Sequence, residues 1–117
     1  MWNKVRFAKK YPVEVNLEGW PAIIGDVLQK IRLSRDDIKL FLFTQVNLST
    51  IKEVMRIMDL PMSRTHTIMQ KWGYTGSACI PMVLDDAVRE GKLKPGDNVV
   101  MCASGGGLNM ACVAFRW

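Results

Sequence analysis

The last segment of the chain, residues 97–117, constrains the fold most. It holds two apolar runs, residues 99–103 and residues 108–115, separated by Ser104 and three consecutive glycines. Both runs have the length and composition of strands, and a short glycine-containing connection between them is typical of a β-hairpin. Two nearly all-apolar strands must be covered on both faces, so the rest of the chain is expected to supply layers on this sheet. The glycines either permit only a tight turn or also leave backbone N–H donors open to a ligand.

Helical and strand patterns alternate through the first half of the chain. Apolar residues recur at three- and four-residue steps over residues 18–32, which predicts a helix. Residues 39–44 include a continuous apolar run, which predicts a buried strand. Asn47 is a suitable N-cap for a second amphipathic helix. Residues 1–17 show no helical period and are interpreted as an N-terminal arm, with an edge strand as one possibility around Val13 to Val15.

The second half continues the alternation. The second helix is expected to end at Leu60-Pro61, and residues 64–69 are a short strand candidate. Residues 72–81 predict a loop that leads into a third helix, which ends at Gly91. The order predicts an α/β fold, a mixed sheet of about four strands with helices packed on its faces, ending in a β-hairpin. Open edges on so small a sheet indicate that a partner half is missing.

Composition limits the classes of function. The net charge is +5, which favours an acidic partner, or is simply a solvated basic face. No nucleic-acid-binding motif accompanies the charge, so nucleic acid is disfavoured. Three cysteines without C-x-x-C spacing, beside a single histidine, predict neither a metal site nor a disulfide framework. Buried thiols predict a reducing, cytoplasmic compartment, and His66 is interpreted as structural. No run is apolar and long enough for a membrane span, and no signal peptide is expected.

Three motifs together resemble the C-terminal half of 3-oxoacyl-acyl-carrier-protein synthase III, in the thiolase-like family. Residues 44–48, T-Q-V-N-L, are similar to the family's H-Q-A-N-L. Residues 73–81, G-Y-T-G-S-A-C-I-P, are similar to G-N-T-S-A-A-S-V-P, and residues 84–88, L-D-D-A-V, to L-D-E-A-V. The glycine triplet precedes the last strand, as in the family. The resemblance covers residues 18–117, which are interpreted as one domain after the arm.

The resemblance implies an acyltransferase that condenses an acyl group with malonyl-acyl-carrier protein through a Cys–His–Asn set. The cysteine belongs to the N-terminal half, outside this chain, so the chain alone is expected to be inactive. Thr44 stands where the histidine is expected and Tyr74 where the asparagine is expected. A threonine hydroxyl is a poor base near neutral pH, whereas a tyrosine hydroxyl can still donate a hydrogen bond to a carbonyl or enolate oxygen. Gly106 matches the family's oxyanion glycine.

The candidate residues fall into three groups. The catalytic positions are Thr44, Tyr74 and Gly106; the substrate-binding candidates are Gln45, Asn47, Gly105 and Gly107; the candidates for docking a carrier protein are Lys52 and Arg56.

Three hypotheses follow. The first is the C-terminal half of a synthase III-like acyltransferase, with a thioester of coenzyme A or of phosphopantetheine as substrate and no bound cofactor. The second is a non-catalytic subunit or scaffold that binds a partner or acyl-carrier protein through its basic helix. The third is nucleic-acid binding by the basic face. The expected partners are the N-terminal half of the same synthase, acyl-carrier protein and further copies of the chain.

Overall fold

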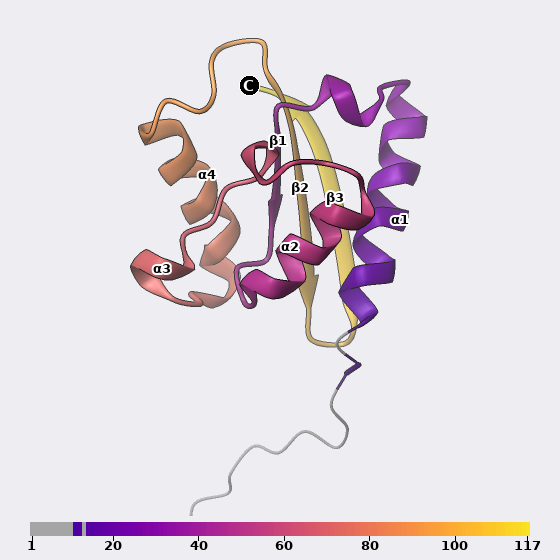
Figure 1. Ribbon diagram of the computed structural model, residues 1–117, viewed down its shortest axis with the longest axis vertical. Coiled ribbons are helices and arrows are strands. Elements are labelled where there is room, and N and C mark those ends of the chain that lie inside the picture. The colour runs from indigo at the N-terminus through magenta and orange to yellow at the C-terminus, as the bar shows by residue number, and fades with distance from the viewer. Residues whose placement is uncertain (1–10, 13) are drawn as a thin grey trace, which may run out of the picture.

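The computed structural model describes residues 11, 12 and 14–117 (Figure 1). In this part of the chain, helices and strands alternate as the sequence predicts. The helices are α1 (Glu14–Ile31), α2 (Leu48–Ile57), α3 (Met69–Trp72) and α4 (Cys79–Arg89). The strands are β1 (Leu40–Phe43), β2 (Asn98–Gly105) and β3 (Asn109–Arg116). Single turns of 3₁₀ helix lie at Arg35–Asp37, Met62–Arg64 and Gly76–Ala78.

The strands form one mixed sheet in the order β1-β2-β3. Strand β1 pairs with β2 in parallel, with Phe43 opposite Cys102. Strand β2 pairs with β3 antiparallel, and Gly105 opposite Asn109 closes the hairpin that the sequence predicts. Because β1 and β2 run in parallel, their carboxyl ends lie at the same edge of the sheet, next to the hairpin connection.

Helices cover both faces of the sheet (Figure 1). Helices α1 and α2 pack on one face, where their buried residues join Phe41 and Phe43 of β1 in one core cluster. Helix α4 packs on the other face, against Leu40 and Leu42. All four residues of β1 are buried because alternate side chains enter opposite layers. The indole of Trp20 stacks on Phe43, with ring centroids 5.0 Å apart, which fixes α1 over the end of β1.

The sheet of the described residues has three strands, so the prediction of about four is wrong by one strand. The strand candidate at residues 64–69 forms only an isolated parallel bridge between Thr65 and Phe41. Part of its backbone is satisfied by a side chain instead of a strand ladder: the N–H of Ile68 donates to the side-chain oxygen of Gln45 at 3.0 Å. The Thr65 hydroxyl donates to the carbonyl of Phe41 at 2.5 Å. The segment therefore lies beside β1 without extending the sheet.

Helix α1 begins four residues earlier than predicted, at Glu14 instead of residue 18. Glu14 and Val15 are therefore helical, and the edge strand proposed around them is wrong. The N–H of Val15 donates to the carbonyl of Pro12 at 3.2 Å, and Leu17 packs against the core under α1. The rest of the predicted arm, residues 1–10 and 13, lies outside the described residues.

The remaining helix ends agree closely with the sequence prediction. Asn47 caps α2, as predicted, and α2 ends before the predicted Leu60-Pro61. Helix α4 ends at Arg89, two residues before Gly91, whose φ of 72° suits the left-handed conformation after a helix. Among the described residues, none of the helices combines the length and apolarity that a bilayer crossing requires.

Candidate active site at the carboxyl end of the sheet

Two neighbouring parallel strands end at the position that the sequence motifs mark. Thr44 directly follows β1, and Ser104 lies one residue before the end of β2. The N–H of Ser104 donates to the Thr44 hydroxyl oxygen at 3.0 Å, a contact between residues 60 positions apart. This hydrogen bond ties the end of β1 to the end of β2. It places Thr44 at the edge where ligands bind in open α/β sheets.

Two adjoining hollows open at this edge, and they share Thr44, Tyr74, Ser104 and Gly105 in their walls. The first, of about 470 Å³, is also lined by Asn47 and by the hairpin connection, including Gly106. The second, of about 370 Å³, extends toward the start of α4. The structure therefore brings the three predicted catalytic positions to the wall of one cavity, although they lie far apart in the sequence.

Thr44 and Tyr74 both line this cavity, but they differ in solvent exposure. Thr44 is only 7% exposed, and its oxygen already accepts the Ser104 N–H, so its hydroxyl proton is left to donate. Tyr74 is 56% exposed and sits in the loop after α3, just before the 3₁₀ turn at Gly76–Ala78. Both groups can donate to an oxygen atom of a ligand. Neither is a base of useful strength near neutral pH.

The glycine-rich connection supplies backbone donors at the same cavity. Gly105 ends β2 and Gly106 follows it, and both line the 470 Å³ hollow. The N–H of Gly107 donates to the phenolic oxygen of Tyr11 at 3.2 Å, which shows that an oxygen atom can approach the bare backbone here. Gly107 itself has a φ of 146° and lies outside the walls of both hollows.

Gln45 does not lie in the cavity, so its predicted role in substrate binding does not match its place in the structure. Its side chain is fully buried. The amide nitrogen donates to the carbonyl of Phe43 at 2.8 Å, and the amide oxygen accepts the N–H of Ile68 at 3.0 Å. A weaker contact of 3.5 Å reaches the carbonyl of His66. The side chain turns inward because the backbone of residues 66–68 has no ladder partner.

Asn47 lines the 470 Å³ hollow and also caps α2. Its side-chain oxygen accepts the N–H of Ser49 at 3.0 Å and the Ser49 hydroxyl at 2.6 Å. The carrier-docking candidates, Lys52 and Arg56, lie further along α2 at a separate hollow of about 440 Å³. Arg56 forms a two-point ion pair with Glu53, at 2.6 and 2.9 Å, which raises the pKa of Arg56 and lowers the pKa of Glu53. Their docking role stays a prediction.

Sequence reasoning missed a polar network behind the glycine connection. The Ser104 hydroxyl donates to the side-chain oxygen of Asn16 at 2.6 Å and accepts the indole N–H of Trp20 at 2.8 Å. Asn16 and Tyr11 fell in the predicted arm, and Trp20 in a helix predicted only from its apolar stripe. Trp20 and Asn16 lie 84 and 88 residues from Ser104, so no local sequence pattern predicts these contacts. The network fixes the position of the end of β2 relative to α1.

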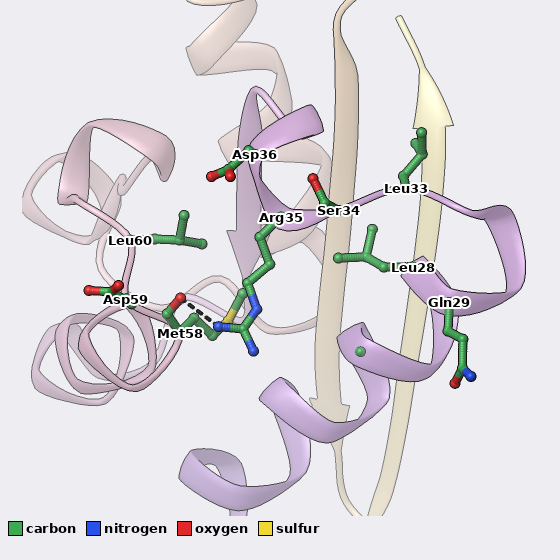
Figure 2. A pocket seen from close by; sticks show the side chains of 10 residues that line it. Leu28, Gln29, Leu33, Ser34, Arg35, Asp36, Met58, Asp59 and Leu60 are labelled. Carbon is green, nitrogen blue, oxygen red and sulfur yellow. Dashed lines mark hydrogen bonds between the residues drawn. The ribbon is translucent and has the colours of Figure 1, made fainter.

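A larger hollow, of about 540 Å³, lies at the opposite end of the molecule and contains none of the predicted catalytic residues (Figure 2). It opens between the ends of α1 and α2. The Arg35 guanidinium points into it and donates to the carbonyl of Met58 at 2.7 Å. Because the Arg35 guanidinium already hydrogen-bonds the C-terminal end of α2, we interpret it as a residue that stabilises the fold and not as a ligand-binding group.

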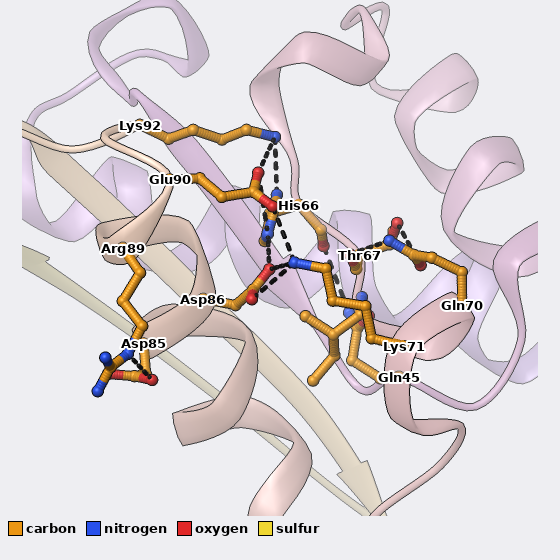
Figure 3. Close-up of polar contacts among 11 residues, drawn as sticks. Gln45, His66, Thr67, Gln70, Lys71, Asp85, Asp86, Arg89, Glu90 and Lys92 are labelled. Carbon is orange, nitrogen blue, oxygen red and sulfur yellow. Dashed lines mark hydrogen bonds and ion pairs between the residues drawn. The ribbon is translucent and has the colours of Figure 1, made fainter.

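A charged cluster lies on the α4 face (Figure 3). The Lys71 ammonium contacts both oxygens of Asp86 at 2.8 and 2.9 Å and one oxygen of Glu90 at 2.9 Å. The Nε2 atom of His66 lies 2.7 Å from Asp86, and its Nδ1 lies 2.7 Å from the Lys92 ammonium. Lys92 can only donate, so Nδ1 accepts and Nε2–H donates to Asp86. Hydrogen bonds from Lys71 first, then His66, lower the pKa of Asp86.

This cluster has the ligand types of a metal site but the contacts of an ion-pair network. His66, Asp86 and Glu90 offer ligand atoms that lie within 4.8 Å of one another. The Lys71 ammonium already pairs with both carboxylates, and the Lys92 ammonium lies 3.9 Å from Glu90, so two cations face the two negative charges. The structural interpretation of His66 agrees with these contacts, and the expectation that the chain holds no metal stays a prediction.

Comparisons with known proteins agree with the motifs at this site. Residues 28–117 match the sequence profile of the family described as 3-Oxoacyl-[acyl-carrier-protein (ACP)] synthase III C terminal. The chain is 40% identical over 97 residues to "Beta-ketoacyl-[acyl-carrier-protein] synthase III 2" of Halalkalibacterium halodurans, covering 83% of this chain and 29% of that protein. It is 30% identical over 97 residues to "Beta-ketoacyl-[acyl-carrier-protein] synthase III" of Porphyra umbilicalis, covering 83% of this chain and 30% of that protein.

The fold is similar to solved structures of the same kind. Against the crystal structure of 3-oxoacyl-[acyl-carrier-protein] synthase III from Aquifex aeolicus, the TM-score is 0.87 at 30% identity. The match covers 90% of this chain and 34% of that chain. The chain thus spans about a third of the length of the relatives it matches, and its fold is that of a thiolase-like half-domain.

Proposed function

This chain belongs to the 3-oxoacyl-[acyl-carrier-protein] synthase III C-terminal family, and on that premise we propose that it is the C-terminal domain of an acyltransferase that acts on acyl thioesters in fatty-acid or related biosynthesis. The observation that carries the proposal is the arrangement of Thr44, Tyr74 and Gly106 around one hollow of about 470 Å³. This hollow lies at the carboxyl end of two parallel strands, where α/β folds bind ligands. The substrates are thioesters of coenzyme A or acyl-carrier protein, with no resident cofactor.

The chemistry at this cavity is hydrogen-bond donation to a carbonyl or enolate oxygen. The Thr44 hydroxyl has its oxygen occupied by the Ser104 N–H and therefore donates. Tyr74, which belongs to a different motif from Thr44, donates from its phenolic hydroxyl. Gly106 donates its backbone N–H to a developing oxyanion. The nucleophilic cysteine comes from the N-terminal half of the parent protein. With no base among these three groups, the site stabilises an oxyanion better than it moves a proton.

The N-terminal half is the partner that completes the domain. On the α4 side of the sheet, apolar side chains of the hairpin are exposed, among them Ala111 and Val113, the latter 47% exposed. Strand β3 is also an open edge of the described sheet. Such a surface is covered in a stable protein. The isolated chain is therefore expected to self-associate, and a monomer at high concentration in light scattering contradicts this part of the proposal.

The test uses the full-length parent protein and labelled acyl-CoA. We expect a covalent acyl-cysteine adduct in the N-terminal half, detected by mass spectrometry, and slower transfer in Thr44→Val and Tyr74→Phe variants. Gln29→Ala, an exposed change on α1 far from the cavity, serves as the matched control. The double change Thr44→His with Tyr74→Asn restores the family pattern and is expected to raise decarboxylation of malonyl thioester. A parent protein that forms no adduct refutes the proposal.

A second candidate function is a non-catalytic synthase-like subunit that docks an acidic carrier protein. It is favoured by the loss of the family's histidine and asparagine and by the exposed cations of α2, Lys52 and Arg56. Carrier-protein binding that weakens steeply with salt and with Lys52→Glu, without any acyl adduct, identifies this function. Tight, salt-sensitive binding of duplex nucleic acid instead of carrier protein supports the basic-face hypothesis.

A further inference from the structure

Two of the three cysteines lie directly opposite each other in the terminal hairpin. Cys102 of β2 pairs with Cys112 of β3 in the antiparallel register. Both side chains belong to the core cluster under α1 and α2, so they point to the same face of the sheet. Directly opposite residues in antiparallel strands have Cα atoms about 4.5 or 5.5 Å apart. Both separations fall within the range of about 4.4–6.8 Å that a disulfide spans.

The environments of the two thiols differ. Cys102 is fully buried, whereas Cys112 is partly exposed and accessible to a reagent in solution. Hydrogen bonding between the two sulfur atoms lowers the pKa of Cys112, whereas the same interaction, together with burial, raises the pKa of Cys102. The accessible sulfur is thus also the better nucleophile, and the buried thiol is in contact with it.

We propose that Cys102 and Cys112 are a redox-active pair that forms a reversible disulfide across the hairpin. The oxidant is a small-molecule disulfide such as oxidised glutathione. The Cys112 thiolate attacks one sulfur of the oxidant, forms a mixed disulfide and releases one thiolate. The Cys102 thiol then gives up its proton to solvent, and its sulfur attacks the Cys112 sulfur. The protein disulfide forms, a second small thiolate leaves, and two electrons have passed to the oxidant.

The pair is placed to affect the candidate site. Cys102 lies two residues before Ser104, whose N–H holds the Thr44 hydroxyl and whose own hydroxyl joins α1 to the hairpin. A covalent link between β2 and β3 at this position restrains the two strands that carry the glycine connection. The redox state of the pair therefore sets the rigidity of the backbone that faces the cavity. This inference is independent of the reaction that the parent protein catalyses.

Cys79 provides a built-in comparison. It lies at the start of α4 on another element, is buried, and has no cysteine opposite it in the sheet. It is expected to remain a thiol while the hairpin pair is oxidised. Trypsin separates the two cases, because Cys79 falls in the peptide of residues 72–89. Cys102 and Cys112 stay together in the peptide of residues 93–116, since Lys94 precedes proline and resists cleavage.

The experiment is a titration of the folded 117-residue chain with oxidised and reduced glutathione. Free thiols are blocked with an alkylating reagent, the protein is denatured and digested with trypsin, and the peptide masses are measured by mass spectrometry. We expect two of the three thiols to disappear together. The 93–116 peptide should lose two hydrogens and carry no alkyl group or glutathione, and dithiothreitol should reverse the change. Cys79→Ser should behave as the wild type, and Cys112→Ser should leave Cys102 reduced, with circular dichroism reporting whether each variant folds.

Three outcomes overturn the proposal. One is a stable glutathione adduct on Cys112 with Cys102 still free. Another is oxidation that only links separate chains through Cys112, visible as dimers on a non-reducing gel. The third is loss of the Cys79 thiol before the hairpin pair. Because all three are read on the wild-type protein, the result does not depend on the folding of any variant.

Discussion

Replacing Gln45 by leucine tests whether this residue supports the fold instead of binding substrate. Leucine keeps roughly the same volume but removes both hydrogen-bonding atoms of the amide. Two backbone groups then lose their partners: the carbonyl of Phe43, held at 2.8 Å, and the N–H of Ile68, held at 3.0 Å. Both residues are fully buried, so water cannot replace the lost contacts.

The size of the effect follows from these contacts. Each buried backbone group without a partner costs about 1–3 kcal/mol, so the two together cost about 2–6 kcal/mol. Burying leucine in place of an amide returns about 1–2 kcal/mol, because the apolar side chain has no polar atoms to remove from water. The free energy of unfolding is therefore expected to fall by about 1–4 kcal/mol, a large share of the total for a small domain.

Urea unfolding followed by circular dichroism measures this change. With a slope of about 1–3 kcal/mol per molar urea, a loss of about 3 kcal/mol lowers the midpoint by about 1–3 M. Gln29→Leu is the matched control, since Gln29 is exposed on α1 and the same substitution there should shift stability by about 0.5 kcal/mol or less. If Gln45→Leu is as stable as this control, the amide does not hold the backbone of residues 66–68, and the argument for its structural role fails.

Three further predictions concern charge, backbone and capping. Hydrogen bonding to Lys71 first lowers the pKa of Asp86 from its ordinary 3.8, so the folded chain binds fewer protons than the unfolded chain near that pH. The stabilising contribution of Asp86 is complete above the ordinary pKa and is lost as the pH falls through the lower folded value. In Asp86→Asn, the slope of the unfolding free energy against pH should therefore be flatter than in the wild type below about pH 4. Gly107→Ala should cost about 1–3 kcal/mol in thermal unfolding, because φ is 146° and a Cβ would lie 2.6 Å from a side-chain amide; Gly106→Ala, with open space around it, should cost less. Asn47→Ala should cost about 1 kcal/mol in urea unfolding, and Asn47→Asp should restore most of it; equal losses in both variants contradict the capping role.

Elements with strong local signals could be predicted from the amino-acid sequence alone. The apolar stripes of α1 and α2 face a core, Asn47 begins α2, and the glycine triplet connects the last two strands. These features depend on the period of apolar residues and on turn and cap chemistry, which neighbouring residues decide among themselves. The motifs that contain Thr44, Tyr74 and Gly106 also come together at one pocket, and the role of these residues there stays a prediction.

Features that depend on partners far away in the chain became visible only in the folded structure. Gln45 turns into the core because the backbone of a segment more than twenty residues away needs its amide. Residues 64–69, predicted as a short strand, form only one isolated bridge to β1, and the N–H of Ile68 donates to Gln45 instead of to a neighbouring strand. Ser104 meets α1 across more than eighty residues, and Cys102 meets Cys112 because the register of β2 on β3 places them opposite each other. Such long-range pairings form when the layers pack together, because buried polar groups need hydrogen-bond partners and distant segments become neighbours only in the packed structure.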